Sequence, residues 1–317
     1  MPSKTEGVGL GPAIDVHNLT KKFQQNTAVE DLTFHVDKGE VFGLLGPNGA
    51  GKTTTVRILC SLIPPTSGSV SIGGYDIANS DGSMKARKLI GLVPDNVGLY
   101  DSLSAVDNLE FYGRMYEAPE KLVKENIEKY LKMLGLWDKR NETVGTYSKG
   151  MKQKVAVARA IIHDPEILIM DEPTANLDPE AAKTIRDFIL ELKKENRTIM
   201  LNTHNLDEAQ RICTKIGVLK TRLIAVDTPA NLEKSLSGNR ISITLAEINS
   251  RILQSVKDLN LGNVAQDGET LLIDLVDMDR DTPLVVSAIA AAGGKIRAVN
   301  ELKGSLEDAY FNLVKEK

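Results

Sequence analysis

The chain has 317 residues, a formal net charge of −4 and a pI of about 5.7. This length predicts roughly two domains, and the acidic balance excludes a protein that binds nucleic acid through overall positive charge. The sequence has no apolar leader and no uncharged apolar run near the ~18 residues of a membrane-spanning helix, so we expect a soluble chain that does not itself cross a membrane.

The first two segments of the chain are a tail and an α/β domain. Residues 1–12 are expected to form a flexible tail, and residues 13–236 a domain in which short strands alternate with helices. Near-continuous apolar runs in this domain are typical of strands buried on both faces of a sheet. Strands are predicted at VFGLLG (residues 41–46), ILIMDE (167–172), TIMLNT (198–203) and IGVLK (216–220).

A helical segment at about residues 96–165 interrupts the α/β pattern. We expect two helices between residues 104 and 136 and a third that begins after Ser148. Three lysines and no acid occupy the first turns of this third helix: Lys149, Lys152 and Lys154. Cations are unfavourable at the positive end of a helix dipole, and Gly150 costs about 1 kcal/mol relative to Ala in a helix. A bound anion would explain the lysines, and a close backbone approach to a phosphate would explain the glycine.

Residues 237–317 predict a small α+β domain of ferredoxin-like type. Its pattern is strand, helix, strand, strand, helix, strand, helix. Strands alternate with period two at residues 241–245 and 271–276, and helical patterns lie near residues 252–259, 284–292 and 306–313. The acids Asp277, Asp279 and Asp281 are expected to form a solvated turn. We expect this domain to serve packing, dimerisation or regulation.

The most specific motif is GPNGAGKTT (residues 46–54), which matches G-x-x-x-x-G-K-[ST] between a predicted strand and a predicted helix. Its glycines let successive backbone N–H groups face inward around an anion. Lys52 is expected to reach the β- and γ-phosphates of a nucleotide, and the Thr53 hydroxyl to bind Mg²⁺. A dinucleotide fingerprint would lack the Lys-Thr pair, so that alternative fails. The expected phosphate-binding residues are Gly46, Pro47, Asn48, Gly49, Ala50, Gly51, Lys52, Thr53 and Thr54.

Three polar side chains follow the predicted strands beside this loop. Asp171 ends an apolar strand at the same sheet edge as the loop, where its carboxylate is expected to hold Mg²⁺ or a water bound to it. Glu172 is expected to act as the general base on the attacking water. A single histidine at a strand end is more often structural, but His204 ends the next strand at the same edge and is expected to contact a γ-phosphate.

These motifs, in this order, resemble the ATP-binding cassette (ABC) family, in particular the nucleotide-binding subunits of ABC transporters. The resemblance covers about residues 14–227 and includes the turn ANLDP (175–179) and YSKGM (147–151), which is similar to the family signature. It implies a P-loop NTPase cassette with a mixed sheet core and a helical subdomain. It also implies an ATPase that uses ATP and Mg²⁺, with Lys52, Glu172 and His204 as catalytic residues.

The resemblance further implies a mechanism that needs two copies. Two cassettes pair head to tail, so that Ser148 and the Gly150 N–H of one contact the γ-phosphate held by the other. Lys149 is expected to contact the nucleotide there, Asp178 to couple the two sites, and Phe23 to stack on adenine. ATP binding closes the pair, hydrolysis reopens it, and the motion drives transmembrane permease subunits. Lys152 and Lys154 are expected to face solvent.

Two departures from the family pattern bear on these expectations. The first, third and fifth signature positions are Tyr147, Lys149 and Met151, while the serine and the second glycine are kept. Asp95 stands where the family usually has a glutamine near the metal, and we expect it to reach Mg²⁺ and to be tolerated. An altered residue here and the ending GSLEDAYFNLV (304–314) are similar to export-type cassettes for drug, lipid or ion efflux.

The leading interpretation is therefore an ATPase subunit of an exporter, present as a homodimer on the cytoplasmic face of the cell membrane through its permease, with no nucleic-acid partner. One alternative is a soluble ABC ATPase that acts on nucleic acid or ribosomes. A second is a regulatory subunit that barely hydrolyses ATP, which only Asp95 favours.

Overall fold

The computed structural model describes residues 11–236, 239–302 and 310. The chain divides into two compact units, residues 1–228 and 229–317. Helix α8 (Pro229–Leu236) thus belongs to the second unit, whereas the sequence placed the boundary after it. Most of the predicted tail and the predicted last helix lie outside the described residues. Within the described ranges, no helix is both long and apolar enough to cross a bilayer.

The first unit is built on a six-stranded sheet with the strand order β10-β9-β3-β8-β7-β6. Its strands are β3 (Val41–Leu45), β6 (Ile90–Val93), β7 (Ile167–Asp171), β8 (Thr198–Thr203), β9 (Lys215–Lys220) and β10 (Arg222–Asp227). Neighbours from β6 to β9 are parallel, and β10 is antiparallel. Every residue of β3, β7 and β8 is buried, as predicted for strands covered on both faces.

A second, antiparallel sheet with the order β2-β1-β4-β5 shares a core with the first. Its strands are β1 (Ile14–Phe23), β2 (Asn26–Val36), β4 (Ser67–Ile72) and β5 (Tyr75–Asp76). Phe34 of β2 stacks on Phe42 of β3 with ring centroids 5.2 Å apart. The turn between β1 and β2 leaves Phe23 about half exposed, with 45% of its surface accessible.

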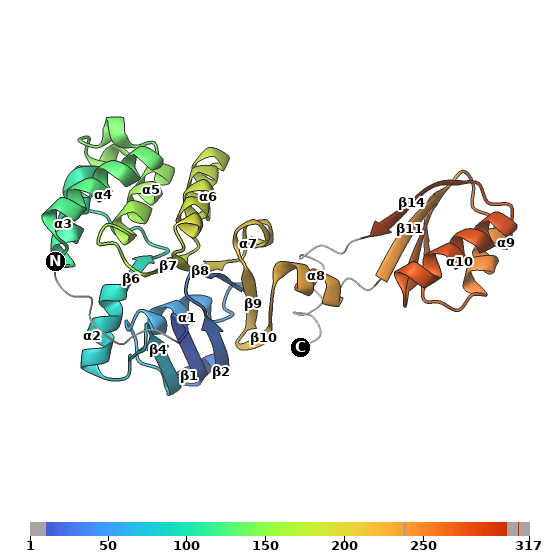
Figure 1. Cartoon of the computed structure of the whole chain (residues 1–317), viewed down its shortest axis with the longest axis horizontal. Helices are drawn as coiled ribbons and strands as arrows, with labels where there is room; N and C mark the ends of the chain where they lie inside the picture. Colours follow the sequence, from blue (N-terminus) through green and yellow to red (C-terminus); the bar gives the residue numbers. More distant parts are fainter. Residues whose placement is uncertain (1–10, 237–238, 303–309, 311–317) are drawn as a thin grey trace. The chain divides into compact units, whose positions relative to one another are not determined.

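The helices of the first unit confirm the predicted helical insertion. In Figure 1, α3 (Ala105–Met115), α4 (Glu120–Met133) and α5 (Lys149–Ala160) form one group away from α1 (Lys52–Leu59) and the antiparallel sheet. The other helical elements are α2 (Ser80–Leu89), α6 (Pro179–Lys194), α7 (Leu206–Ile212) and the short 3-10 turns Trp137–Lys139 and Val144–Thr146. Ser148 caps α5 by accepting the Met151 N–H at 3.2 Å, as its position predicts.

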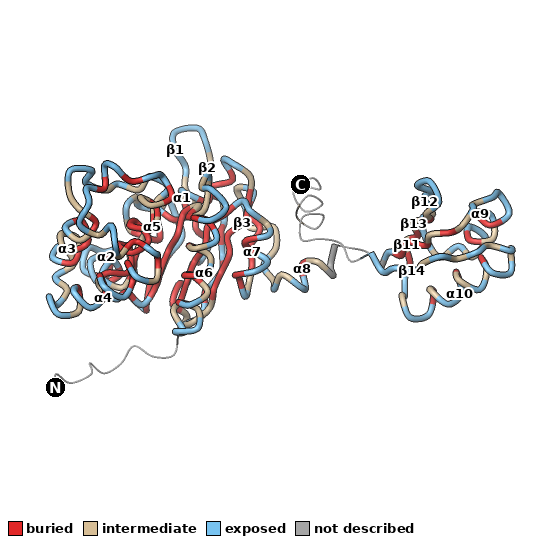
Figure 2. Tube along the Cα trace, turned by 90° about the horizontal axis from the view of Figure 1, so that it is seen from above, coloured by how far each residue is buried: buried red, intermediate tan, exposed pale blue. Residues whose placement is uncertain are grey.

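The second unit contains a four-stranded antiparallel sheet with the order β12-β13-β11-β14. Its elements after α8 are β11 (Asn239–Leu245), α9 (Ser250–Lys257), β12 (Val264–Asp267), β13 (Thr270–Leu275), α10 (Met278–Ala291) and β14 (Ile296–Leu302). The order strand, helix, strand, strand, helix, strand is the one expected from the sequence. Figure 2 shows that this unit has its own buried core.

The predicted solvated turn in this unit is wrong for Asp281. Its side chain is 0% exposed and accepts hydrogen bonds from Arg280 Nε at 2.8 Å and from the Asp277 N–H at 2.9 Å. Asp277 is the N-cap of α10, so this acidic segment is the ordered start of a helix.

Candidate functional site

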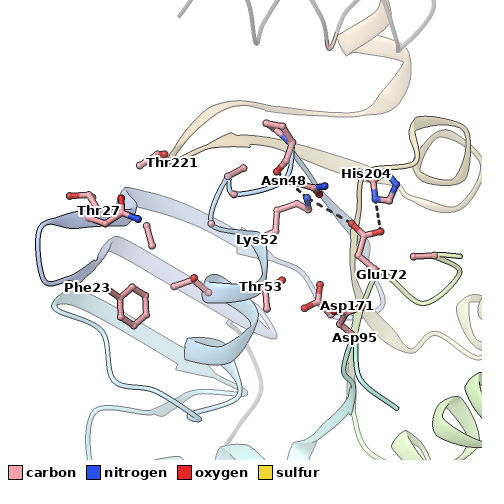
Figure 3. Close-up of a pocket in the computed structure, with 18 of the residues that line it drawn as sticks. Phe23, Thr27, Asn48, Lys52, Thr53, Asp95, Asp171, Glu172, His204 and Thr221 are labelled. Carbon is pink, nitrogen blue, oxygen red and sulfur yellow. Dashed lines mark hydrogen bonds and ion pairs between the residues drawn. The ribbon is translucent and has the colours of Figure 1, made fainter. Parts of the chain in front are cut away.

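An open cavity of about 590 Å³ lies where parallel strands β3, β7 and β8 end. Figure 3 shows Phe23 toward one end of it and Glu172 and His204 toward the other. The predicted residues that line it are Phe23, Pro47, Asn48, Gly49, Ala50, Gly51, Lys52, Thr53, Thr54, Asp95, Asp171, Glu172 and His204. Ala175 and Asn176, from the predicted turn ANLDP, also line it, as do four residues that the sequence did not single out: Asn26, Thr27, Ala28 and Thr221.

The loop after β3 curls as the glycine pattern predicts. Gly51 has φ 101°, in the left-handed region, and a Cβ there would lie 2.3 Å from the Ala28 carbonyl oxygen. Helix α1 follows directly, with no acidic residue in its first turn and no capping side chain among the described residues. The backbone N–H groups of this helix start are therefore suited to an anion such as a phosphate.

Lys52 is buried inside this loop. Its Nζ donates to the carbonyl oxygens of Gly46 at 2.6 Å and Pro47 at 3.3 Å, and lies 3.8 Å from Glu172 Oε1. Burial lowers the pKa of Lys52, and the negative charges of Glu172 and Asp171 only partly offset this. The loop thus holds a desolvated cation that can bind phosphate oxygens.

Asp171 is the last residue of β7 and is 3% exposed. Its carboxylate accepts hydrogen bonds from Asn202, its partner on β8, and from Thr53 at the start of α1. Burial raises the pKa of Asp171; the hydrogen bonds lower it, and the charges of Glu172 and Asp95 raise it further.

The oxygen atoms at this end of the cavity fit a Mg²⁺ ion. Thr53, Asp171 and Asp95 offer a hydroxyl and two carboxylates, the hard oxygen donors that Mg²⁺ prefers. A cation there would also relieve the mutual repulsion of the carboxylates. Asn202 Oδ1 is buried without a hydrogen-bond partner among the described residues, so the polar shell around Asp171 is not saturated.

Glu172 and His204 are in contact across neighbouring strands. Glu172 Oε2 lies 2.8 Å from His204 Nδ1, and the two side chains are 16% and 58% exposed. Glu172 has φ 51°, a left-handed conformation that is uncommon for a residue other than glycine. Its N–H donates to the Asn202 carbonyl at 2.8 Å, which holds the turn against β8. The geometry thus brings together Lys52, Glu172 and His204, as the sequence predicts.

The signature residues lie elsewhere on the first unit. None of Ser148, Lys149, Gly150 and Asp178 is among the described residues that line the cavity. Asp178 is the N-cap of α6 and accepts the Ala181 N–H at 2.8 Å. Ser148 and Lys149 are exposed at the start of α5. A single chain therefore does not bring the two predicted halves of the site together.

The structure adds to one expectation about this helix start and corrects another. A Cβ on Gly150 would lie 2.6 Å from the Cβ of Ala181, so packing within the chain by itself favours a glycine, apart from any phosphate. Lys152 was expected to face solvent, but its Nζ pairs with Asp101 at 2.8 Å and its side chain is only 23% exposed. The opposing acid comes from the loop before α3, which the local sequence around α5 could not reveal.

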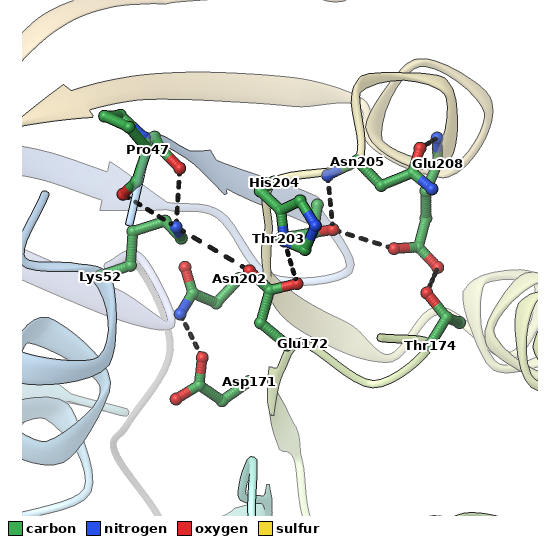
Figure 4. A network of polar contacts seen from close by, with 11 residues as sticks. Pro47, Lys52, Asp171, Glu172, Thr174, Asn202, Thr203, His204, Asn205 and Glu208 are labelled. Atoms are coloured by element: carbon green, nitrogen blue, oxygen red, sulfur yellow. Dashed lines mark hydrogen bonds and ion pairs between the residues drawn. The ribbon is translucent and has the colours of Figure 1, made fainter. Parts of the chain in front are cut away.

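A polar network beside Glu172 was not predicted from the sequence. Glu208, on α7, is 1% exposed and accepts hydrogen bonds from the hydroxyls of Thr174 and Thr203 (Figure 4). The spacing Asn205–Glu208 resembles a capping box, in which the glutamate would turn back toward the helix start. Asn205 does cap α7, but the carboxylate of Glu208 bonds to the two threonines instead. Burial raises the pKa of Glu208, while these two bonds lower it.

Known proteins similar to this chain agree with the geometry. A protein family described as "ABC transporter" matches residues 29–175. The linearmycin resistance ATP-binding protein LnrL of Bacillus subtilis (strain 168) is 32% identical over 95% of this chain and 97% of its own length. The daunorubicin resistance ATP-binding protein DrrA3 of Streptomyces coeruleorubidus is 32% identical over 95% of both chains.

Solved structures give the same result for the first unit. An ATP-binding subunit of an ABC transporter superposes with a TM-score of 0.65 and 31% identity, covering 71% of this chain and 93% of that one. A dimeric post-hydrolysis state of an ATP-binding cassette bound to ADP and Pi has a TM-score of 0.62 and 27% identity, covering 68% and 98%. These similarities support an ATPase of a transport system and do not support a soluble or purely regulatory protein.

Proposed function

The chain belongs to the ABC transporter ATP-binding family and is an ATP-binding, ATP-hydrolysing subunit; from this premise we propose that two copies of it drive a separate permease that exports its substrate. Resistance and export proteins recur among the relatives, including the linearmycin and daunorubicin proteins and a Nod factor export protein. Their names support export as the direction of transport. The subunit would then lie at the cytoplasmic face of the membrane, held there by the permease.

A head-to-tail homodimer is supported by the separation of the two half-sites. The cavity holds the phosphate loop, whereas Ser148, Lys149 and Gly150 lie at the start of α5 outside it. A second copy can bring its α5 start to the open cavity, and Asp178 lies beside Gly150, where it can sense this contact. The α5 start contributes a hydroxyl and a positive charge, both suited to a γ-phosphate.

Within one copy, different residues along the cavity bind the different parts of ATP. Phe23, at the end of the cavity away from His204, offers an exposed ring on which adenine can stack (Figure 3). Lys52 and the N–H groups of the α1 start bind the β- and γ-phosphates. Thr53, Asp171 and Asp95 would hold Mg²⁺, which neutralises phosphate charge when bound.

Glu172 is the proposed general base. Its carboxylate takes a proton from a water molecule whose oxygen bonds to the γ-phosphorus; the bond from that phosphorus to the β–γ bridging oxygen breaks, releasing ADP and phosphate. The contact at 2.8 Å with His204 orients the carboxylate, and Lys52 Nζ lies 3.8 Å from its other oxygen. This group of three neighbouring side chains in the cavity is the observation that carries the proposal.

The test is steady-state ATPase activity of Glu172→Gln beside wild type. We expect the turnover rate to fall by about 10²- to 10⁴-fold, because general-base catalysis typically contributes that much. ATP binding should remain, and the ATP-bound dimer should persist because it cannot hydrolyse. Equal turnover in the two proteins would contradict the assignment of Glu172 and favour a subunit that hydrolyses by another route.

We further propose that the second unit serves dimerisation or regulation. It contains its own buried core, and no group of three His, Cys, Asp or Glu suited to a metal occurs in the described chain. Removal of residues beyond 228 should change assembly or ATPase regulation while the phosphate loop stays intact. Unchanged dimerisation and unchanged ATPase regulation would contradict this role.

A further inference from the structure

Glu208 is a buried carboxylate to which the proposed hydrolysis assigns no role. Its side chain lies in the first turn of α7 and is 1% exposed. Thr174 Oγ1 donates to Glu208 Oε1 at 2.8 Å, and Thr203 Oγ1 donates to Oε2 at 3.0 Å. Both carboxylate oxygens are therefore bonded, which offsets the cost of burying the group.

The direction of the Thr203 bond is fixed by a second contact. Thr203 Oγ1 also accepts the Asn205 N–H at 3.0 Å, so its single proton points to Glu208. Asn205 Oδ1 in turn accepts the Glu208 N–H at 3.0 Å. The start of α7 thus holds the Glu208 backbone, while the carboxylate bonds to Thr174 in the loop after β7 and to Thr203 at the end of β8.

The two threonines flank the residues proposed to react. Thr174 lies two positions after Glu172, and Thr203 lies directly before His204. Thr174 lies in the loop after β7 and Thr203 is the last residue of β8, and one carboxylate joins these two segments (Figure 4). The Glu172–His204 contact of 2.8 Å joins the carboxyl ends of the same two strands, so the Glu208 bridge and the reacting pair are two links between the same segments.

The turn after β7 is strained and needs such a link. Glu172 has φ 51°, and sparsely populated conformations persist only where surrounding contacts over-determine them. On one side the Glu172 N–H bonds to Asn202 O at 2.8 Å, and the turn closes with the Ala175 N–H on Glu172 O at 3.1 Å. On the other side Thr174, inside that turn, is held by Glu208.

We propose that Glu208 is a positioning residue for ATP hydrolysis: through Thr174 and Thr203 it fixes the spacing between the carboxylate of Glu172 and the ring of His204. This inference rests on the proposed role of Glu172. It differs from a merely structural hydrogen bond, whose loss would lower the stability of the fold without changing the rate of the chemical step selectively.

The experiment compares Thr174→Val and Glu208→Gln with wild type in the full chain, using MgATP in single-turnover assays so that slow variants stay measurable. Thr174→Val removes one hydroxyl and nothing else from the network. We expect the hydrolysis rate to fall roughly tenfold in both variants, because a displacement near 1 Å at a reacting group has large effects on rate. ATP affinity should stay within about twofold of wild type, since neither side chain lines the cavity.

Thr184→Val is the matched control. Thr184, half-buried on α6, also donates one hydroxyl bond, to Glu180 O at 2.9 Å, and this bond is not part of the network. Its hydrolysis rate should equal that of wild type. A rate in Thr174→Val and Glu208→Gln within about twofold of this control would overturn the proposal.

A double-mutant cycle with His204→Ala tests the route of the effect. If Glu208 acts by aligning Glu172 with His204, Glu208→Gln should cost about twofold or less once His204 is removed. An undiminished tenfold loss there would overturn the proposal. Glu172→Gln separates this outcome from failure of the proposed function: retained turnover contradicts the base itself, whereas lost turnover with an unaffected Thr174→Val contradicts Glu208 alone.

Discussion

Two helix starts in the first unit, those of α1 and α5, differ in whether their own side chains already satisfy their backbone N–H groups. Both lack an acidic residue in the first turn. The α1 start has no side-chain cap among the described residues and opens into the cavity beside buried Lys52. The α5 start is capped by its own Ser148, lies outside the cavity, and exposes Lys149.

This difference suits the α1 start to binding a ligand within its own chain and the α5 start to contributing to the site of a second copy. The backbone donors at α1 are left for a ligand, so this helix start is complete only with a phosphate. At α5 the local structure is satisfied without one: Ser148 accepts a backbone N–H, and Lys152 is paired with Asp101. In the proposed dimer, the α5 start would meet an anion only when a second copy brings its bound nucleotide there.

The largest expected effect is on ATP binding at the start of α1. Lys52→Ala should weaken ATP binding by about 100-fold, because it removes charge-assisted hydrogen bonds to phosphate oxygens from a buried site. The measurement is equilibrium titration with a fluorescent ATP analogue. Lys154→Ala, on α5 outside the cavity, is the matched control and should bind ATP as wild type does. Equal losses in both variants would erase the distinction between the two helix starts.

The next largest expected effect is on ATP-dependent dimerisation through the start of α5. In the Glu172→Gln background, Lys149→Glu should raise the ATP concentration needed for dimerisation about tenfold, because it reverses an exposed charge that would face the partner's phosphate in the proposed dimer. Lys154→Glu should change it by less than about twofold. Light scattering at increasing ATP concentration measures both. Equal effects would make Lys149 part of a solvated charged surface only.

Gly150→Ala tests whether packing is the reason for a glycine at the start of α5. A methyl group gains about 1 kcal/mol in helix propensity, but overpacking against Ala181 at 2.6 Å costs about 1–3 kcal/mol. We therefore expect a net loss of about 1 kcal/mol in the free energy of unfolding without nucleotide. Urea denaturation followed by Trp137, the only tryptophan and part of the first unit, measures it.

A gain in stability for Gly150→Ala would contradict the packing requirement and leave phosphate approach as the reason for the glycine. The double variant Gly150→Ala, Ala181→Gly provides the control, since removal of the facing methyl restores the space. Its loss should be smaller than the sum of the two single losses.

Local patterns predicted the parts of this molecule that depend on neighbours in sequence. The strand at residues 198–203 was predicted with its observed bounds, because a strand buried on both faces is an apolar run. The phosphate loop was recognised because its glycines, lysine and threonine act through one continuous backbone. Helix capping by Ser148 likewise needs only the next three residues.

Contacts between distant segments could not be predicted in this way. Lys152 and Asp101 are 51 positions apart, and Thr174 and Glu208 are 34 apart. These pairs exist because the fold brings the loop before α3 to α5 and places β7 beside β8. The division of the chain falls before α8 rather than after it, and the period of a helix does not specify to which unit the helix belongs.

The smallest expected effect concerns Asp95, which lines the cavity into which the start of α1 opens. Asp95 is exposed, so water screens its charge, although it lies near enough to raise the pKa of Asp171. Asp95→Gln should therefore change the turnover rate by less than about threefold at saturating Mg²⁺ and raise the Mg²⁺ concentration for half-maximal rate by a similar factor. Titration of ATPase activity with Mg²⁺ measures both quantities.

Asp95→Asn, which removes the charge at unchanged length, should match Asp95→Gln if charge alone matters. ATPase activity absent in wild type and present in Asp95→Gln would show instead that this carboxylate blocks the site, and that the uncapped start of α1 is not sufficient for a productive complex.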